Sequence, residues 1–193
     1  MNPLADTLKQ LASALESVGI PYVIGGSVAS AVRGVVRATY DVDLVAHIGL
    51  SQTEQLAKAL GPAWYADPFQ MRSAIAAGRS FNLIDTHLGN KVDIFPATEE
   101  FHHSQLQRAT RVALRFLGDE HLYPVATAED ILLAKLQWYA AGGEVSERQW
   151  TDILGILKTG RPLDQAYVEA WALRLGVARL LARALAEVAG ELA

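Results

Sequence analysis

The sequence predicts an α/β (α+β) fold in which a small mixed sheet is flanked by helices and followed by a C-terminal helical region. Short β-prone runs alternate with helical periodicity over roughly the first 120 residues, and capping signals with Ala/Leu-rich periodicity dominate after Thr127. No Pro/Gly/Ser-rich linker divides the two halves. We therefore expect an α/β core over residues 1–120 and a helical region over residues 121–193 that packs on this core.

Apolar spacing and turn residues define the elements of the first half. Leucines recur at helical spacing from Leu4 to Leu15, and Gly19 ends this helix. The elements expected after it are a strand at 22–24, a short helix that Ser27 caps and Gly34 ends, a strand at 41–48, a helix at 51–60 with Ser51 and Glu54 in a capping box, a short strand at 64–65, and a hairpin of strands at 81–85 and 91–95.

The second half begins after a strand expected at 112–116. The residues TAED, from Thr127 to Asp130, form a capping box that opens a helix to about Ala141. The residues SERQ, from Ser146, open the next helix. After Pro162 the pattern is helical to the end of the sequence.

Composition limits the class of function. The formal net charge is -4 and the pI is about 5.7, so any contact with nucleic acid has to come from a local patch. The absence of cysteine excludes disulfides and thiolate metal sites. We see no signal peptide and no apolar run of about 18 residues without a charge. We therefore expect a cytoplasmic protein that does not enter a membrane.

Two carboxylates stand out in the strand expected at 41–48. Asp41 and Asp43 are separated by one residue, so both side chains project from the same face of that strand. Carboxylates this close repel each other unless a cation lies between them. Mg²⁺ prefers such oxygen ligands and keeps water and substrate phosphates in its shell. The alternative is an exposed strand face that carries ordinary solvated charges.

Gly25, Gly26 and Ser27 lie between the preceding strand and helix. Such a loop can present backbone N–H groups and a hydroxyl to phosphate oxygens. The alternative is a tight turn with no ligand. Taken with Asp41 and Asp43, the loop indicates a site that holds a triphosphate and its metal. Arg37 precedes the carboxylates and is a candidate for a phosphate contact, with an ordinary loop role as the alternative.

The segment IGGSVASAVRGVVRATYDVDLV resembles the signature of the nucleotidyltransferase fold shared with DNA polymerase β. Its parts are a hydrophobic residue, Gly-Gly-Ser, a 13-residue spacer and Asp-Val-Asp-Leu. The resemblance implies a third carboxylate on a neighbouring strand, which is Asp93 in KVDIF, with Asp85 as the alternative. It further implies that Asp41 and Asp43 bind Mg²⁺, with two ions possible. Asp93 would help bind the catalytic metal or take the proton from the attacking hydroxyl. The substrate would be a nucleoside triphosphate (NTP), and pyrophosphate would leave.

Lys135 lies within an apolar helical face, where a lysine has to snorkel, pair or face a cleft. The segment EDILLAKLQWYAAGGEVSERQWTDILGIL resembles the second half of AbiEii-like toxin nucleotidyltransferases, which carry a lysine and then an aspartate on successive helices. This resemblance covers about residues 20–158. It implies that Lys135 contacts the triphosphate and that Asp152 completes the pocket; from the helical wheel alone, Asp152 is a solvent-exposed residue.

Three functions therefore remain in view. The first is an AbiEii-like nucleotidyltransferase that modifies an acceptor such as RNA or tRNA as a toxin and is opposed by an antitoxin. The second is a small-molecule nucleotidyltransferase similar to the aminoglycoside-modifying enzymes, which share the same signature. The third is a catalytically idle nucleotidyltransferase-like module that binds a partner.

Overall fold

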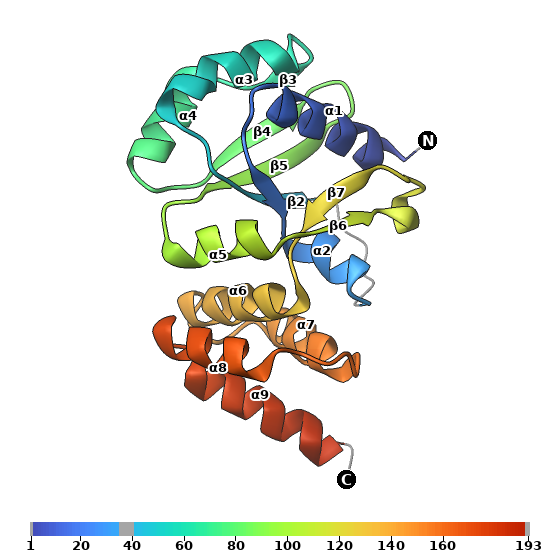
Figure 1. Ribbon diagram of the computed structural model, residues 1–193, viewed down its shortest axis with the longest axis vertical. Coiled ribbons are helices and arrows are strands. Elements are labelled where there is room, and N and C mark those ends of the chain that lie inside the picture. Colours follow the sequence, from blue (N-terminus) through green and yellow to red (C-terminus); the bar gives the residue numbers. More distant parts are fainter. Residues whose placement is uncertain (1, 35–40, 192–193) are drawn as a thin grey trace. The chain divides into compact units, whose positions relative to one another are not determined.

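The computed structural model describes residues 2–34 and 41–191 (Figure 1). The chain forms two compact units, each of which draws on two segments. The sheet unit comprises Met1–Ala29 and Arg37–Ala126, and the helical unit comprises Ser30–Val36 and Thr127–Ala193. The border expected at residue 120 precedes the last strand of the sheet. This strand belongs to the sheet unit because it pairs with two other strands.

The sheet unit is built on a mixed sheet of seven strands in the order β3-β4-β5-β2-β1-β7-β6. These strands are β1 (Tyr22–Ile24), β2 (Asp41–Ala46), β3 (Trp64–Tyr65), β4 (Phe81–Asp85), β5 (Asn90–Pro96), β6 (Thr110–Ala113) and β7 (Leu122–Val125). β2 lies in the middle of the sheet, parallel to β5 on one side and antiparallel to β1 on the other. The backbone of β2 is therefore paired with a strand on each side, and this pairing fixes the positions of its residues in the sheet.

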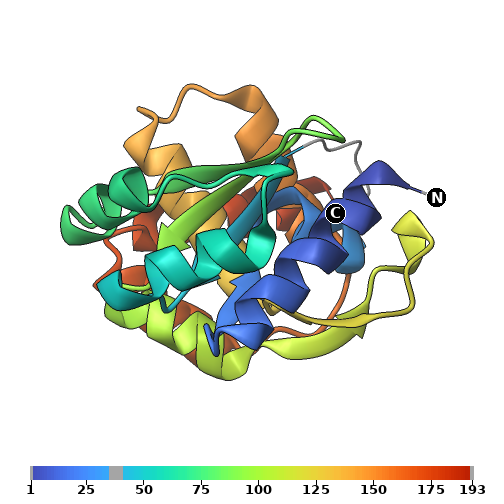
Figure 2. The ribbon, with the colours of Figure 1, turned by 90° about the horizontal axis from the view of Figure 1, so that it is seen from above.

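Helices cover both faces of the sheet. On one face lie α1 (Pro3–Ser17), α3 (Thr53–Leu60) and α4 (Pro68–Ala76), and on the other lies α5 (Glu100–Arg108) (Figures 1 and 2). Leu8, Leu11 and Leu15 of α1 are at most 1% exposed, as the leucine periodicity predicts. Two short 3-10 helices, η1 (Leu50–Gln52) and η2 (Arg115–Leu117), complete the described elements of this unit. The helix α2 (Gly26–Val32) begins in the sheet unit and continues into the helical unit.

The helical unit contains α6 (Ala128–Ala141), α7 (Glu147–Lys158), α8 (Gln165–Arg174) and α9 (Ala178–Glu191). α6 packs on α7 and α8, and α9 packs on α7 and α8. Leu132, Leu136 and Ile153 are fully buried in its core. The segment after α2 takes part in this packing, because a Cβ atom on Gly34 would lie 3.5 Å from Thr159 Cγ2.

Several elements confirm the sequence predictions. The strand at 22–24, the strand at 64–65 and the hairpin formed by β4 and β5 are present. Thr127 caps α6 by accepting a hydrogen bond from Asp130 N, and Ser146 caps α7 by accepting one from Gln149 N. The capping signals were therefore reliable guides to where these helices begin.

Three local predictions were wrong. Ser51 is not the cap of a helix, because η1 occupies 50–52 and the side chain of Gln52 accepts from Gly49 N at 2.8 Å. Ser27 is not the cap of α2, because the helix starts at Gly26 and Gly25 O accepts the first helical bond, from Ala29 N. The strand expected at 112–116 is shifted to β6, and η2 follows it.

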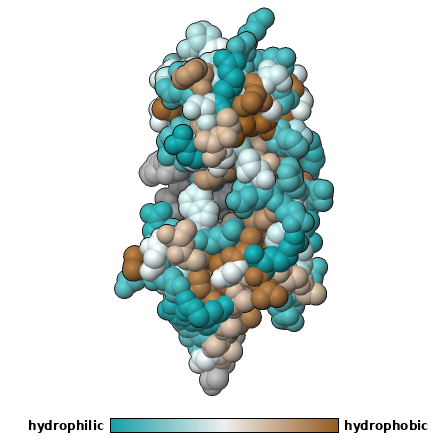
Figure 3. All heavy atoms as spheres, turned by 90° about the vertical axis from the view of Figure 1, so that its left-hand side faces the viewer, coloured by the Kyte–Doolittle hydropathy of each residue, from teal (hydrophilic) through white to brown (hydrophobic). Residues whose placement is uncertain are grey.

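None of the helices in the described part of the chain is long and apolar enough to cross a membrane. On the face shown in Figure 3, hydrophilic and hydrophobic residues are intermixed. The most exposed large hydrophobic residues, Val145, Phe69 and Leu173, belong to different elements or loops.

Candidate active site

The central strands β2 and β5 have one buried face and one half-buried face. Val42, Leu44 and Val92 are at most 1% exposed. Asp43 and Asp93 alternate with these residues and are half-buried. Since successive side chains of a strand point to opposite faces, the carboxylates lie on the face away from the apolar core. A buried central strand can therefore carry aspartates without placing a charge in its hydrophobic layer.

The register of the two strands brings the predicted carboxylates to the same level. β2 and β5 are parallel, and the Cα atom of Asp43 is aligned with that of Asp93. Neighbouring strands are about 4.8 Å apart, and aligned residues share a face of the sheet. Asp43 and Asp93 are thus close neighbours although 50 positions separate them in the sequence. The described part of Asp41 is its backbone, which is aligned with Lys91.

Lys91 is a charged residue of this face that was not among the residues predicted from the sequence. Its Nζ atom lies 2.9 Å from Asp93 Oδ2. The signal was present, because residues two apart in a strand share a face and Lys91 is two positions before Asp93. The face therefore carries a cation next to its carboxylates.

The glycine loop lies directly against Asp43. Gly26 has a φ of +54°, and a Cβ atom at this position would lie 1.8 Å from Asp43 Oδ2. Gly25 N donates a hydrogen bond of 2.8 Å to Asp43 O, which ties the loop to the strand. Only glycine both adopts this backbone conformation without strain and leaves room for the carboxylate. The loop backbone and the Asp43 carboxylate consequently form one local structure.

Three further residues predicted to contact phosphate are Gly25, Ser27 and Arg37. The N–H group of Gly25 donates to Asp43 O on β2, and Gly26 begins α2. Ser27 lies in the first turn of α2. Arg37 lies outside the described residues.

Asp85, the alternative third carboxylate, lies on the opposite face of the sheet. It lies two positions after Leu83 and therefore shares the buried face with it, and it is 1% exposed. Its Oδ2 atom accepts a hydrogen bond of 2.8 Å from Thr7 Oγ1 of α1, and its Oδ1 atom accepts from the backbone of His87 and Leu88. Asp85 therefore joins α1 to the hairpin turn, and Asp93 is the carboxylate that shares a face with Asp43.

Lys135 and Asp152 meet within the helical unit. Lys135 Nζ of α6 lies 2.8 Å from Asp152 Oδ2 of α7, and the two side chains are 15% and 13% exposed. The lysine in the apolar face of α6 is thus a paired lysine, and Asp152 is not the solvent-exposed residue that the helical wheel favoured. The pairing explains how both charges are accommodated in a mostly buried place. Their predicted contact with a nucleotide stays a prediction.

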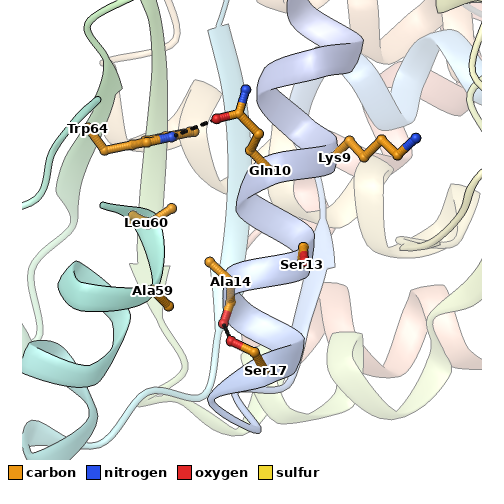
Figure 4. Close-up of a pocket in the computed structure, with 8 residues that line it drawn as sticks. All are labelled: Lys9, Gln10, Ser13, Ala14, Ser17, Ala59, Leu60 and Trp64. Carbon is orange, nitrogen blue, oxygen red and sulfur yellow. Dashed lines mark hydrogen bonds between the residues drawn. The ribbon is translucent and has the colours of Figure 1, made fainter. Parts of the chain in front are cut away.

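The sheet unit also has a hollow of about 460 Å³, whose lining residues are drawn in Figure 4. It is lined by α1, by the end of α3 and by Trp64, whose Nε1 atom donates to Gln10 Oε1 at 3.3 Å. No carboxylate lines it, and α1 covers the face opposite to Asp93. We therefore do not assign the predicted chemistry to this hollow.

The donor set at Asp43 and Asp93 fits a hard divalent cation such as Mg²⁺. Both residues supply carboxylate oxygens from aligned positions, and the loop backbone against Asp43 leaves no room for a side chain. Among the side chains that the structure describes, which exclude that of Asp41, no three carboxylates or histidines are grouped around one point. The three-carboxylate set Asp41, Asp43 and Asp93 accordingly stays a prediction.

No protein-family model matches the chain, and no curated protein matches its sequence. Solved structures do match. The solution structure of the antibiotic-resistance factor ANT(2'')-Ia has a TM-score of 0.55 at 15% identity, with 95% of this chain and 98% of that chain covered. The crystal structure of an antigenic nucleotidyltransferase-like protein from Paracoccidioides brasiliensis has a TM-score of 0.55 at 22% identity, with 96% and 93% covered. ANT(2'')-Ia in complex with adenylyl-2''-tobramycin has a TM-score of 0.52 at 13% identity, with 89% and 96% covered.

These similarities confirm the predicted fold. The chain has the nucleotidyltransferase fold, with a mixed sheet flanked by helices and a helical region after it. Identities this low carry the architecture alone, because one fold supports many activities. The reaction, its metal and its acceptor have to be argued from the site.

Proposed function

We propose that the protein is a metal-dependent nucleotidyltransferase that transfers a nucleotide from an NTP to an acceptor and releases pyrophosphate. The observation that supports this most is the alignment of Asp43 with Asp93 on the half-buried face, with the Gly26 backbone directly against the Asp43 carboxylate. Two carboxylates beside a glycine loop suit a phosphate chain and the cation that accompanies it. The nucleotidyltransferase fold adds support.

In this proposal Asp41, Asp43 and Asp93 hold Mg²⁺, with two ions possible. Bound Mg²⁺ would neutralise charge on the phosphates and on the attacking and leaving oxygens. Asp93 has two alternative roles: it helps to hold the catalytic metal, or it accepts the proton of the acceptor hydroxyl as the hydroxyl oxygen attacks the α-phosphorus. The new bond joins that oxygen to phosphorus, and the bond to the bridging oxygen of pyrophosphate breaks.

The glycine loop orients the triphosphate for this in-line attack. We assign the phosphate contacts to the loop of Gly25, Gly26 and Ser27, in which the bond from Gly25 N to Asp43 O fixes the loop against the strand. Arg37 is proposed as an additional phosphate contact on the strength of its position in the sequence. For Lys135 and Asp152 the support is the AbiEii-like resemblance, and their ion pair is the local observation that accompanies it.

Two acceptors are proposed. The AbiEii-like resemblance favours RNA or tRNA, which would make the protein a cytoplasmic toxin opposed by an antitoxin. The similarity to ANT(2'')-Ia, an antibiotic-resistance factor solved with adenylyl-2''-tobramycin, favours a small aminoglycoside-type acceptor instead. The formal net charge of -4 suits a small cationic acceptor better than a long RNA footprint.

A transfer assay distinguishes these acceptors. The purified protein is incubated with Mg²⁺ and each α-labelled NTP, together with total RNA, with an aminoglycoside panel, or with no added acceptor. We expect label in one acceptor class, and a loss of about 100-fold or more in Asp93→Asn, the size typical for removal of a general base. Glu169→Gln, which removes an exposed carboxylate of α8, is the matched control and should retain full activity.

The idle-module alternative predicts a different result. Calorimetric titration with each NTP and Mg²⁺ measures binding without requiring the right acceptor. Binding that is lost in Asp43→Asn supports a nucleotide site even where no label is transferred. If the unaltered protein binds no nucleotide at millimolar concentration, the enzyme proposal is abandoned in favour of a protein-binding module.

A further inference from the structure

Lys91 sits among the carboxylates of the half-buried face. Its ammonium is 2.9 Å from Asp93 Oδ2, and the side chains of the lysine and the aspartate are 41% and 19% exposed. Its Cα atom is level with that of Asp41 on the neighbouring strand. The lysine therefore lies beside Asp93, one of the carboxylates that are proposed to hold Mg²⁺.

The ammonium group of Lys91 beside Asp93 opposes the binding of a metal cation to the same carboxylate. Like charges a few ångströms apart repel, and this repulsion is stronger in a half-buried site than in bulk water. The ammonium also occupies Oδ2, one of the two oxygens of Asp93. A metal ion that arrives alone has to overcome both effects.

An NTP changes this balance because its phosphate oxygens carry more negative charge than the accompanying metal ion neutralises. The ammonium can then exchange its partner, from the carboxylate of Asp93 to a phosphate oxygen, with no net loss of an ion pair. Lysine suits such an exchange, since its charge is carried at the end of a flexible stem. At 41% exposure the Lys91 side chain also has access to solvent on this face.

We propose that Lys91 is the resident counter-ion of Asp93, which disfavours binding of free metal and favours loading of the metal together with the nucleotide. This inference rests on the proposed function, because it requires metal and nucleotide to bind at Asp93. Lys91 is a substrate-binding residue in this scheme: it pairs with Asp93 in the absence of nucleotide and with a phosphate oxygen in its presence, and it does not take part in the bond exchange.

The opposite signs of its two effects make the proposal testable. Free Mn²⁺ binding is measured by the loss of the free-ion EPR signal, with no nucleotide present, in the chain of 193 residues. We expect Lys91→Met to bind Mn²⁺ about three- to tenfold more tightly, since the repelling charge is gone. The Mg²⁺ complexes of ATP, GTP, CTP and UTP are then titrated in turn against the unaltered protein. The complex that binds should bind Lys91→Met about three- to tenfold more weakly than it binds the unaltered protein.

Three further variants separate this role from a merely structural one. Lys91→Arg keeps the charge and should restore both affinities to within about twofold of the unaltered protein. Lys58→Met removes an exposed lysine of α3 in the same unit and should change neither affinity. In an Asp93→Asn background, the gain in Mn²⁺ affinity from Lys91→Met should become smaller, because the direct repulsion remains but the occupied carboxylate is absent.

The outcomes distinguish the inference from the proposed function. If the unaltered protein binds Mn²⁺ and Lys91→Met binds it equally or less tightly, the inference is overturned and the proposed function stands. Tighter Mn²⁺ binding with unchanged nucleotide affinity overturns the exchange of partners. If the unaltered protein binds neither Mn²⁺ nor nucleotide, the proposed function fails and takes this inference with it.

Discussion

Single residues decide how closely the glycine loop approaches the carboxylates. Gly26 combines a left-handed backbone conformation with an approach to Asp43 that excludes any side chain. The sequence indicated the loop and the carboxylates because glycines and alternating aspartates leave a direct pattern. The sequence could not indicate that Gly25 N donates a hydrogen bond to Asp43 O, since this bond depends on the pairing of β1 with β2.

Gly26→Ala should disrupt the site more than its backbone strain alone explains. Alanine in a left-handed conformation costs about 1–2 kcal/mol of folding free energy, wherever it occurs. Gly89→Ala is the matched control, because Gly89 has a φ of +73° and a Cβ atom added there would meet no other atom within 4 Å. Denaturant unfolding should therefore show a greater loss of stability for Gly26→Ala. Its Mn²⁺ affinity should also fall by about tenfold or more, since the new methyl group displaces Asp43. Equal effects of both variants on metal binding would contradict the assignment.

The residue pattern alone does not decide whether Asp85 or Asp93 shares a face of the sheet with Asp43. Asp85 and Asp93 both lie on the predicted hairpin, and local sequence places both in strands. Their faces are set by the register of β4 against β5, which pairs Asp93 with Asn82 and leaves Asp85 on the side of α1. A shift by one residue would exchange the faces, so only the paired structure separates the two.

At the scale of whole elements, the caps of α6 and α7 were predictable, whereas the caps expected at Ser27 and Ser51 did not form. Thr127 and Ser146 give a direct side-chain signal and cap α6 and α7. The helix α5 was not predicted, because it buries few residues and has no conventional N-cap side chain. The strand β7 was not predicted either, because Pro124 interrupts a four-residue strand and proline weakens a strand pattern. The helix α4 was also missed, although Asp67 followed by proline is a sound start signal.

Lys135→Met should destabilise the helical unit. Removal of one partner leaves the carboxylate of Asp152 mostly buried without its cation, which typically costs about 3 kcal/mol. Urea unfolding followed by circular dichroism measures this change. Lys158→Met, which breaks the exposed pair between α7 and Glu191, is the control and should cost about 0.5 kcal/mol or less.

The double variant Lys135→Met/Asp152→Leu separates stability from nucleotide binding. Replacement of a buried ion pair by apolar residues is often neutral or stabilising, so most of the lost stability should return. If nucleotide affinity stays low in this stable double variant, the role implied by the AbiEii-like resemblance is supported. Normal nucleotide affinity would leave the pair a structural link between α6 and α7.

At the scale of the whole molecule, the sheet unit should lose stability in alkaline solution. Burial, and then the charge of Glu16, raise the pKa of the Tyr22 hydroxyl. Burial and the hydrogen bond to Asp119 raise the pKa of Tyr123. Both tyrosines stay protonated in the folded chain at a pH where the unfolded chain, with tyrosine pKa values near about 10, loses these protons.

The sign follows from the proton balance. Above about pH 10 the unfolded state binds fewer protons than the folded state, so the free energy of unfolding falls as pH rises. Each such tyrosine contributes about 1.4 kcal/mol per pH unit. Unfolding across the range from about pH 9 to about pH 11 should show a smaller decline in Tyr22→Phe than in the unaltered chain. Tyr65→Phe, in the exposed edge strand β3, should leave the decline unchanged. An unaltered decline in Tyr22→Phe would contradict this account.

Two segments that are far apart in the sequence form the helical unit. Its segment Ser30–Val36 comes before most of the sheet unit in the chain, and the remainder follows after Ala126. A single genetic crossover after residue 126 would therefore give the progeny helices from one parent and this short segment from the other. Gly34 would face a foreign partner in place of Thr159. Exchange of this unit between relatives, in nature or in a chimaera, requires two transferred fragments, one of which ends only a few residues before β2.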